Sequence, residues 1–335
     1  ATAMGDGTIA SGPNATAMGL FTEASGEAAT AMGNKTTAKA ASATAMGFDT
    51  VANEVASTAM GEFTTASGEA STATGRYTTA GGDFSVAMGA ETTASGLYSL
   101  AVGDETTASI QAATAMGTET VAATYSSVAI GKFNDANRGN DDADPLTGPL
   151  FVVGNGDRGA RSDALVLNAN GDLTINGTLT ESSDRRLKTS IRPIEGETMA
   201  KLSRLRPVRY QFKNQETHPA GEQIGLVAQD VRTEFPALVR GGDGDDLSLS
   251  YSKFTAVLLK GLQEQQSTVD SLKNRVQRLE QQQEKLDRLQ KRIARLESET
   301  NQSVLAGWVG SGGGLLLVVA LGGLLGGGLF WRRRH

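Results

Sequence analysis

The chain has no cysteine, and this absence limits both how it is stabilised and what chemistry it performs. Its 335 residues include two histidines, His218 and His335, and only 5% are aromatic. Disulfides, thiol catalysis and cysteine-ligated metal clusters are excluded, and a multi-histidine metal centre is not expected. With 41 glycines and few aromatic residues, the composition favours an elongated protein over one large core. We therefore expect no cofactor and no metal.

The formal net charge is -6 at pH 7, and the arginines are concentrated late in the chain. This balance argues against a general nucleic-acid binder, so we expect no nucleic-acid partner. Residue 1 is an alanine in the middle of a repeat, and we expect further sequence or a processed segment ahead of it.

A glycine returns every fourteen residues, ten times over: Gly5, Gly19, Gly33, Gly47, Gly61, Gly75, Gly89, Gly103, Gly117 and Gly131. An alanine precedes each glycine by two positions, and a second alanine column, from Ala10 to Ala136, follows the first by seven positions. A fixed period of this kind indicates a solenoid. Two columns of small residues half a period apart predict two short strands per coil around a narrow lumen. The first predicted domain is this head, residues 1–138.

The residue just before each glycine is apolar in nine of the ten coils, with Thr74 as the exception. Alanine and methionine on opposite sides of a strand indicate two buried faces. We expect the alanines to fill the lumen and the methionines to meet a neighbouring chain, since an exposed methionine stripe would be adhesive. In the alternative arrangement, the methionines form the core and the alanines face the partner.

The coil at residues 127–131, Ser-Val-Ala-Ile-Gly, resembles the signature of trimeric autotransporter adhesin heads. The resemblance covers residues 1–138, because the period, the glycine and the alanine all match. It implies a left-handed parallel β-roll that associates as a homotrimer and displays a surface for a ligand the sequence does not identify. Residues 139–180 follow as a neck, in which β-branched runs and Asn-Gly pairs predict short strands and tight turns. A flexible linker is the alternative for this segment.

A second motif begins at residues 183–188, Ser-Asp-Arg-Arg-Leu-Lys. It is followed by Leu202 to Tyr210, by Gly225 to Val231, by Phe235-Pro236 and by a helix that begins near Tyr251. Residues 181–265 are similar throughout to the endosialidase-type intramolecular chaperone domain, a small α+β domain. That family sits at the C-terminus of trimeric phage tail spikes and fibres, and a related domain occurs in the myelin regulatory factor. The resemblance implies a domain that assists trimer assembly and then cuts its own chain.

The resemblance also implies a serine-lysine dyad, with Ser183 as nucleophile, Lys188 as base and the bond from Ser182 to Ser183 as the cleavage site. A lysine serves as base only where burial or nearby positive charge lowers its pKa, and Arg185 and Arg186 are available to contribute. Five residues do not align on a helix or on a strand. Either a turn intervenes, or Lys188 reaches Ser183 of an adjacent subunit. Ser182 as nucleophile, and a dyad that is present but idle, remain alternatives.

From Phe254 to about Glu299 the pattern is helical, and residues 266–303 are predicted to form a trimeric coiled coil. One heptad seam contains Leu258, Leu262, Gln265, Val269, Leu272, Val276 and Leu279, and a second contains Leu286, Leu289, Ile293 and Leu296. The step between the two seams is a register shift equivalent to a three-residue stammer.

Residues 304–331 carry no charge and precede a basic tail at residues 332–335. Such a stretch is long enough to span a bilayer, and Trp308 and Trp331 occupy the places of interfacial aromatics. We expect a C-terminal transmembrane helix in a single-pass membrane protein, with the C-terminus inside and the N-terminal region outside. A glycine-rich flexible tail is the alternative.

Together these segments predict a mainly β protein with α elements, a trimeric membrane-anchored surface fibre whose chaperone domain cleaves itself and releases the head. Its enzyme activity is limited to one turnover on its own peptide bond. A phage-type tail fibre with an assembly chaperone is the alternative. An ice-binding solenoid is a minor one, prompted by threonines at fourteen-residue spacing from Thr8 to Thr120.

Overall fold

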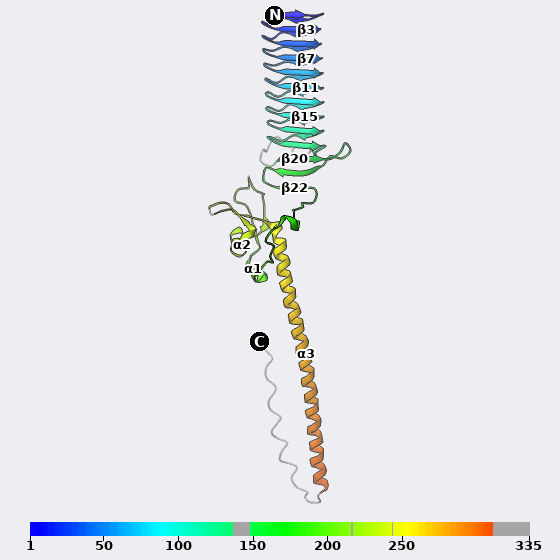
Figure 1. Cartoon of the computed structure of the whole chain (residues 1–335), viewed down its shortest axis with the longest axis vertical. Coiled ribbons are helices and arrows are strands. Elements are labelled where there is room, and N and C mark those ends of the chain that lie inside the picture. The colour runs from blue at the N-terminus through cyan, green and yellow to red at the C-terminus, as the bar shows by residue number, and fades with distance from the viewer. Residues whose placement is uncertain (137–147, 216, 243, 311–335) are drawn as a thin grey trace. The chain divides into compact units, whose positions relative to one another are not determined.

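The structure is a computed structural model that describes residues 1–136, 148–215, 217–242 and 244–310, with side chains as far as residue 303. The chain divides into two units (Figure 1). The first contains Ala1–Ile191 and Pro207–Gly225, and the second contains Arg192–Arg206 and the chain from Leu226 onward.

The first unit begins as a parallel β-solenoid in which a longer strand and a two-residue strand alternate (Figure 1). The longer strands are β1 (Thr2–Met4), β3 (Thr16–Leu20), β5 (Thr30–Asn34), β7 (Thr44–Phe48), β9 (Thr58–Glu62), β11 (Thr72–Arg76), β13 (Val86–Ala90), β15 (Leu100–Asp104), β17 (Thr114–Thr118) and β19 (Val128–Lys132). The short strands are β2 (Ile9–Ala10), β4 (Glu23–Ala24), β6 (Thr37–Ala38), β8 (Val51–Ala52), β10 (Thr65–Ala66), β12 (Thr79–Ala80), β14 (Thr93–Ala94), β16 (Thr107–Ala108) and β18 (Val121–Ala122). Each pairs with its equivalent fourteen residues away, as Ala31 does with Ala45. The predicted solenoid with two strands per coil is thus confirmed.

The lumen is filled by small side chains. The alanine columns from Ala17 to Ala129 and from Ala24 to Ala122 are at most 2% exposed. Methionines at the alternate positions point outward, and four of them are 38 to 58% exposed: Met4, Met18, Met88 and Met116. The alternative with methionines in the core is therefore wrong, because the lumen has room only for side chains of about alanine or threonine size.

The threonine column that prompted the ice-binding alternative also lies in the lumen. From Thr22 to Thr120 these side chains are at most 1% exposed. Each stands two residues before a buried alanine, as Thr22 does before Ala24, so both point to the same side of the strand. A buried column cannot present hydroxyls to an ice surface, and this correction removes the reason for that alternative.

The glycine column is required by how closely successive coils approach. Gly61 has a φ of +123°, and a Cβ there would lie 2.0 Å from the carbonyl oxygen of Gly75. The same geometry recurs along the column, from Gly5 to Gly117. A side chain would force the coils apart in a backbone region that L-residues rarely adopt.

The corners of each coil also carry left-handed residues, and most of these are not glycine. Phe63 and Tyr77 have φ values of 54° and 55°. Left-handed backbone costs such residues roughly 1 to 2 kcal/mol each. Hydrogen bonds between coils offset this cost, since the Phe63 amide donates to the Phe48 carbonyl at 2.9 Å. Ring stacking adds to them, with the Phe63 and Tyr77 centroids 4.9 Å apart.

The neck strands extend the larger head sheet. Strand β20 (Pro149–Asn155) pairs in parallel with β19, and Gly154 lies opposite Gly131. Strands β21 (Asp163–Asn168) and β22 (Leu173–Ile175) then add antiparallel. Residues 149–155, 163–168 and 173–175 of the predicted neck are therefore strands of this sheet and not a flexible linker.

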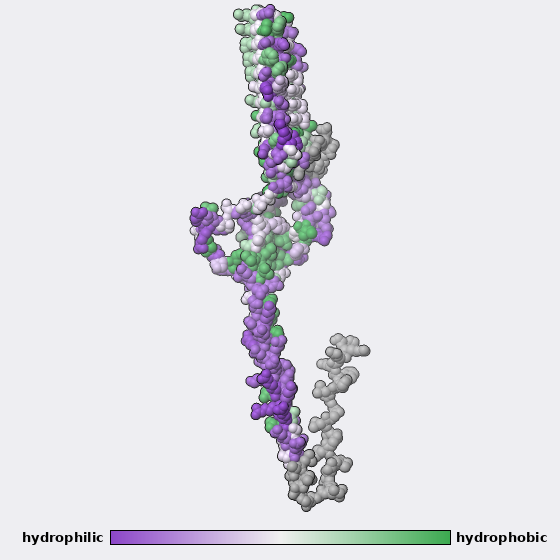
Figure 2. Space-filling view, turned by 90° about the vertical axis from the view of Figure 1, so that its right-hand side faces the viewer, coloured by the Kyte–Doolittle hydropathy of each residue, from purple (hydrophilic) through white to green (hydrophobic). Residues whose placement is uncertain are grey.

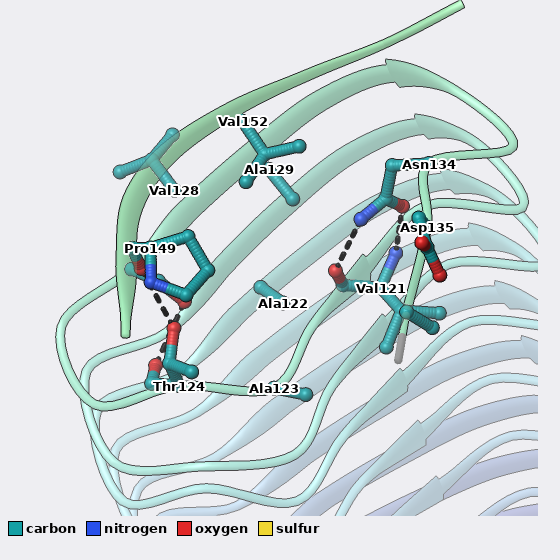
Figure 3. A pocket seen from close by; sticks show the side chains of 12 residues that line it. Val121, Ala122, Ala123, Thr124, Val128, Ala129, Asn134, Asp135, Pro149 and Val152 are labelled. Atoms are coloured by element: carbon teal, nitrogen blue, oxygen red, sulfur yellow. Dashed lines mark hydrogen bonds between the residues drawn. The ribbon is translucent and has the colours of Figure 1, made fainter. Parts of the chain in front are cut away.

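A polar side chain ends the smaller sheet (Figure 3). Asn134 stands where the threonine column would continue, and it is 2% exposed. Its Oδ1 accepts from the Val121 amide at 2.7 Å, and its Nδ2 donates to the Val121 carbonyl at 2.9 Å. Asp163 Oδ1 accepts from the Asp135 amide at 2.9 Å. These side chains replace the main-chain bonds of the next coil.

The second unit is a small α+β region followed by a long helix. Its elements are α1 (Thr198–Arg204), α2 (Ala228–Glu234), a 3-10 turn η2 (Pro236–Leu238), β25 (Val239–Arg240), β26 (Ser248–Leu249) and α3 (Tyr251–Gly310). Its core consists of Leu205, Val231, Leu238, Phe254 and Val257. A hairpin of β23 (Val208–Tyr210) and β24 (Gln223–Gly225) belongs to the first unit.

Helix α3 runs for 60 residues without interruption, which corresponds to about 90 Å. The predicted helix from Phe254 to Glu299 is confirmed, and it passes straight through the register shift between the seams. Among the described residues, no helix is both long and apolar enough to cross a membrane. The predicted span at residues 304–331 lies outside the described residues from position 311 on, and the basic tail at 332–335 lies wholly outside them.

We expect Gly61→Ala to destabilise the head by at least about 2 kcal/mol, because the new Cβ would meet the Gly75 carbonyl oxygen 2.0 Å away. Gly81→Ala is the matched control elsewhere in the solenoid, since the nearest atom to its Cβ would be 3.8 Å away. It should change stability by no more than about 0.5 kcal/mol. Thermal unfolding followed by circular dichroism measures both. Equal losses in the two variants would contradict the close-approach explanation.

Candidate functional site

A single tight turn positions the residues of the second motif. The 3-10 turn η1 (Arg185–Leu187) is capped at its start by Asp184, whose Oδ1 accepts from the Arg186 amide at 2.8 Å. At its end the Lys188 amide donates to the Arg185 carbonyl at 3.1 Å. Asp184 is well suited to this place, because its short carboxylate reaches an amide two residues ahead.

The turn brings Lys188 back to Ser183. The Lys188 Nζ lies 2.6 Å from the Ser183 Oγ, and both belong to the same chain. Of the two ways left open by the five-residue spacing, the structure has the intervening turn. At this distance an unprotonated amine can take the proton of the hydroxyl, and Ser182 lies exposed beside the pair.

The electrostatics of the turn hold Asp184 in its charged form. The Arg186 side chain donates to Asp184, with Nη2 and Oδ2 2.6 Å apart. This hydrogen bond, together with that from the Arg186 amide, lowers the pKa of the Asp184 carboxyl below its ordinary value of 3.8. Asp184 therefore caps the turn as a carboxylate. Sequence reasoning assigned it no role, although an aspartate just before a turn is the usual signal for one.

Nothing in the described part of the chain covers this site. Ser183 and Lys188 are both exposed. The apolar side chains beside them are exposed too, Leu187 by 76% and Ile191 by 59%. Within the described part of the chain, the candidate site is therefore open to solvent. Within the same described residues, no group of three or more acidic or histidine side chains is arranged to hold a metal ion.

Two parts of the chain, the head and the region that begins at Ser183, match known protein families. Five segments, residues 1–22, 24–50, 52–78, 80–106 and 111–134, match the YadA head domain repeat, and residues 183–240 match the chaperone of endosialidase. The chain joins YadA head repeats to an endosialidase chaperone domain. The YadA head repeats account for the solenoid, and the chaperone match begins at Ser183 and includes Lys188.

Phage fibre proteins are also similar to part of the chain. The long tail fiber protein Gp37 of Enterobacteria phage M1 and that of Enterobacteria phage Ox2 are each 32% identical over 96 residues. The match covers 27% of this chain and 38% of each relative, so the chain spans well under half the length of these relatives.

The Arg186 amide should report the ionisation of Asp184 directly. In a chain labelled with nitrogen-15 at arginine, we expect its resonance to titrate with a midpoint below 3.8, since the folded turn lowers that pKa. The cap is thus fully formed above the ordinary pKa and is lost as pH falls through the lowered one. Asp184→Asn should abolish the titration, whereas Glu181→Gln, three residues away, should leave it unchanged. A midpoint at or above 3.8 would show that Asp184 does not cap the turn.

Proposed function

We propose that this protein is a homotrimeric fibre whose chaperone domain promotes assembly and then cuts the chain at the Ser182–Ser183 bond, which frees the head. The observation that carries the proposal is that the chain exposes two long apolar stripes, one on the solenoid and one on α3. The first follows the fourteen-residue repeat, with Thr74 as its exception, and the second follows the heptad seam up to Leu279. The YadA repeats and the phage fibre relatives support the same reading.

On the solenoid, the outward positions of the longer strands form the first stripe. Met4 is 58% exposed, Met88 is 43% exposed and Met116 is 41% exposed. Paired strands hold these positions in register from coil to coil, as Met32 lies opposite Met46. A long apolar face of this kind, with Thr74 as its exception, is rarely left open on a soluble protein. Two further copies of the same face would cover it around a threefold axis.

On α3, the heptad seam forms the second stripe. Its side chains are about half exposed, with Leu262 at 62%, Leu272 at 55% and Leu279 at 55%. Beyond its first turns, where α1 packs against α3, no other helix packs against the seam among the described residues of the chain. Parallel copies of α3 in register would bury it by knobs-into-holes packing. The coiled coil and the head interface would then contain the same number of chains.

The contact between Ser183 and Lys188 supports a cleavage step in which Ser183 is the nucleophile. Lys188 takes the proton of the Ser183 hydroxyl, whose Oγ attacks the carbonyl carbon of Ser182. The bond to the Ser183 nitrogen breaks, and that nitrogen takes the proton back from Lys188. Ser182 is now joined to Ser183 through an ester, and water hydrolyses it. The products are a head that ends in the Ser182 carboxylate and a stump that begins with the Ser183 amine.

Assembly would control when this step occurs. A lysine acts as a base only where its surroundings disfavour the charged ammonium, and burial is the main way proteins achieve this. In the single chain Lys188 is exposed, and so is Leu187. Neighbouring copies that cover the exposed Leu187 and Ile191 side chains would also remove the dyad from water. Cleavage would therefore follow trimer formation.

Two settings for such a fibre rest on different observations. The likeness to long tail fiber proteins favours a phage tail fibre. The uncharged residues 304–331 followed by arginines favour a membrane-anchored surface fibre with its head outside. In both settings the head is the displayed part, and it would bind a molecule on a surface outside the fibre.

The full-length chain should be cut once, and its stump should begin at Ser183. Ser183→Ala removes the nucleophile and Lys188→Ala removes the base, so each variant should remain whole on denaturing gels. Ser182→Ala is the matched control, since it keeps the attacked carbonyl and should still be cut.

Because Ser183 and Lys188 meet within one chain, co-expressing the Ser183→Ala and Lys188→Ala chains should not restore cleavage. Restored cleavage would place the dyad between subunits. Complete cleavage of Lys188→Ala, or a stump that begins at another residue by N-terminal sequencing, would contradict the proposed chemistry.

A further inference from the structure

Within the second unit, an apolar groove lies between α1 and the first turns of α3. It is lined by Met199, Leu202, Ser203, Leu258, Leu262 and Gln265. Hydrophobic residues gather around the start of α3, whereas polar residues cover most of the helix beyond (Figure 2). The groove contains the first three residues of the heptad seam, so it is continuous with the exposed stripe of α3.

The groove is held open by two fixed contacts between the helices. Gly261 lets α1 approach closely, since a Cβ there would lie 2.6 Å from the Leu202 Cδ1. Glu264 anchors the other end of the contact, because its carboxylate accepts from the Met199 amide at 2.9 Å. A glycine in the middle of a helix costs about 1 kcal/mol relative to alanine, and the close packing of Leu202 explains its presence here. These two contacts make helix α1 one wall of the groove.

The heptad register shows on which side of the seam this wall stands. Leu258 and Gln265 occupy d positions and Leu262 occupies an a position, which places Gly261 at g. Since α1 packs on Gly261, it covers the g flank of α3. On the other flank, Leu259 falls at an e position and is 57% exposed. A leucine is unusual there, because e positions of coiled coils are commonly charged.

In a parallel coiled coil, the e flank of one helix faces the g flank of its neighbour. We propose that Leu259 of a second copy of this chain occupies the groove between α1 and α3. This inference rests on the trimer proposed above and names a contact between chains at the N-terminal end of its coiled coil. It accounts for an exposed leucine on one flank and an apolar groove at the same level on the other. Each chain then gives its Leu259 to one neighbour and receives that of the other around a closed ring.

The absence of cysteine from the chain makes the contact directly testable by cross-linking. Chains that carry Met199→Cys are co-expressed with chains that carry Leu259→Cys, so that a disulfide between the two positions can form only between chains. We expect a linked dimer on non-reducing gels, and none from either variant expressed alone. The control replaces Leu259→Cys with Ser267→Cys, at an exposed f position that faces away from the seam.

A second variant tests the same contact without cross-linking. Leu259→Glu would place a charge in the groove. The protein concentration at which half of the chains are assembled should then rise about tenfold or more. Ser267→Glu should assemble like the unchanged chain. A trimer that gives no Met199–Leu259 cross-link, or that tolerates Leu259→Glu, would overturn this inference and leave the trimer itself standing. A monomeric unchanged chain would overturn both.

Discussion

The whole head depends on how closely one coil can lie upon the next. At the glycine column the backbone of one coil meets the carbonyl oxygen of its neighbour where any Cβ would stand, as at Gly61 and Gly75. This approach keeps the ladder of longer strands, β1 to β19, in register beside the nine short strands and leaves a lumen that accepts only small side chains. The coils stack until Asn134 closes the smaller sheet with its amide. The larger sheet passes into the neck without a break.

A lumen this narrow determines where the larger apolar residues go. Methionines that cannot fit inside stand on the outer face, and α3 likewise turns leucines to the outside. A single chain therefore leaves most of its large apolar surface uncovered, which is costly in water. The exposed Ser183 and Lys188 show the same incompleteness at the candidate site. In the proposed fibre, association with further copies would cover the head, the dyad and the helix α3 together.

Sequence periodicity predicted the solenoid well, because a fixed fourteen-residue step leaves few ways to place Ala17 and Ala24. It failed for the column that includes Thr22, since threonine suits both an exposed strand and a narrow lumen, and only the phase relative to Ala24 decides between them. The contact between Ser183 and Lys188 depends on the turn capped by Asp184, which spacing alone left open. Gly261 gave no signal in the sequence, because its role arises from a helix more than fifty residues earlier.

The central claim is that three chains share one axis, and the mass of the intact assembly tests it most directly. The Ser183→Ala chain is the suitable form, because it should remain whole. Sedimentation equilibrium in solution, with density-matched detergent if the chain requires it, should give three times the chain mass of 34.8 kDa. A mass of 34.8 kDa at micromolar concentration would contradict the account, because the apolar faces of the solenoid and of α3 would then be open in the native protein.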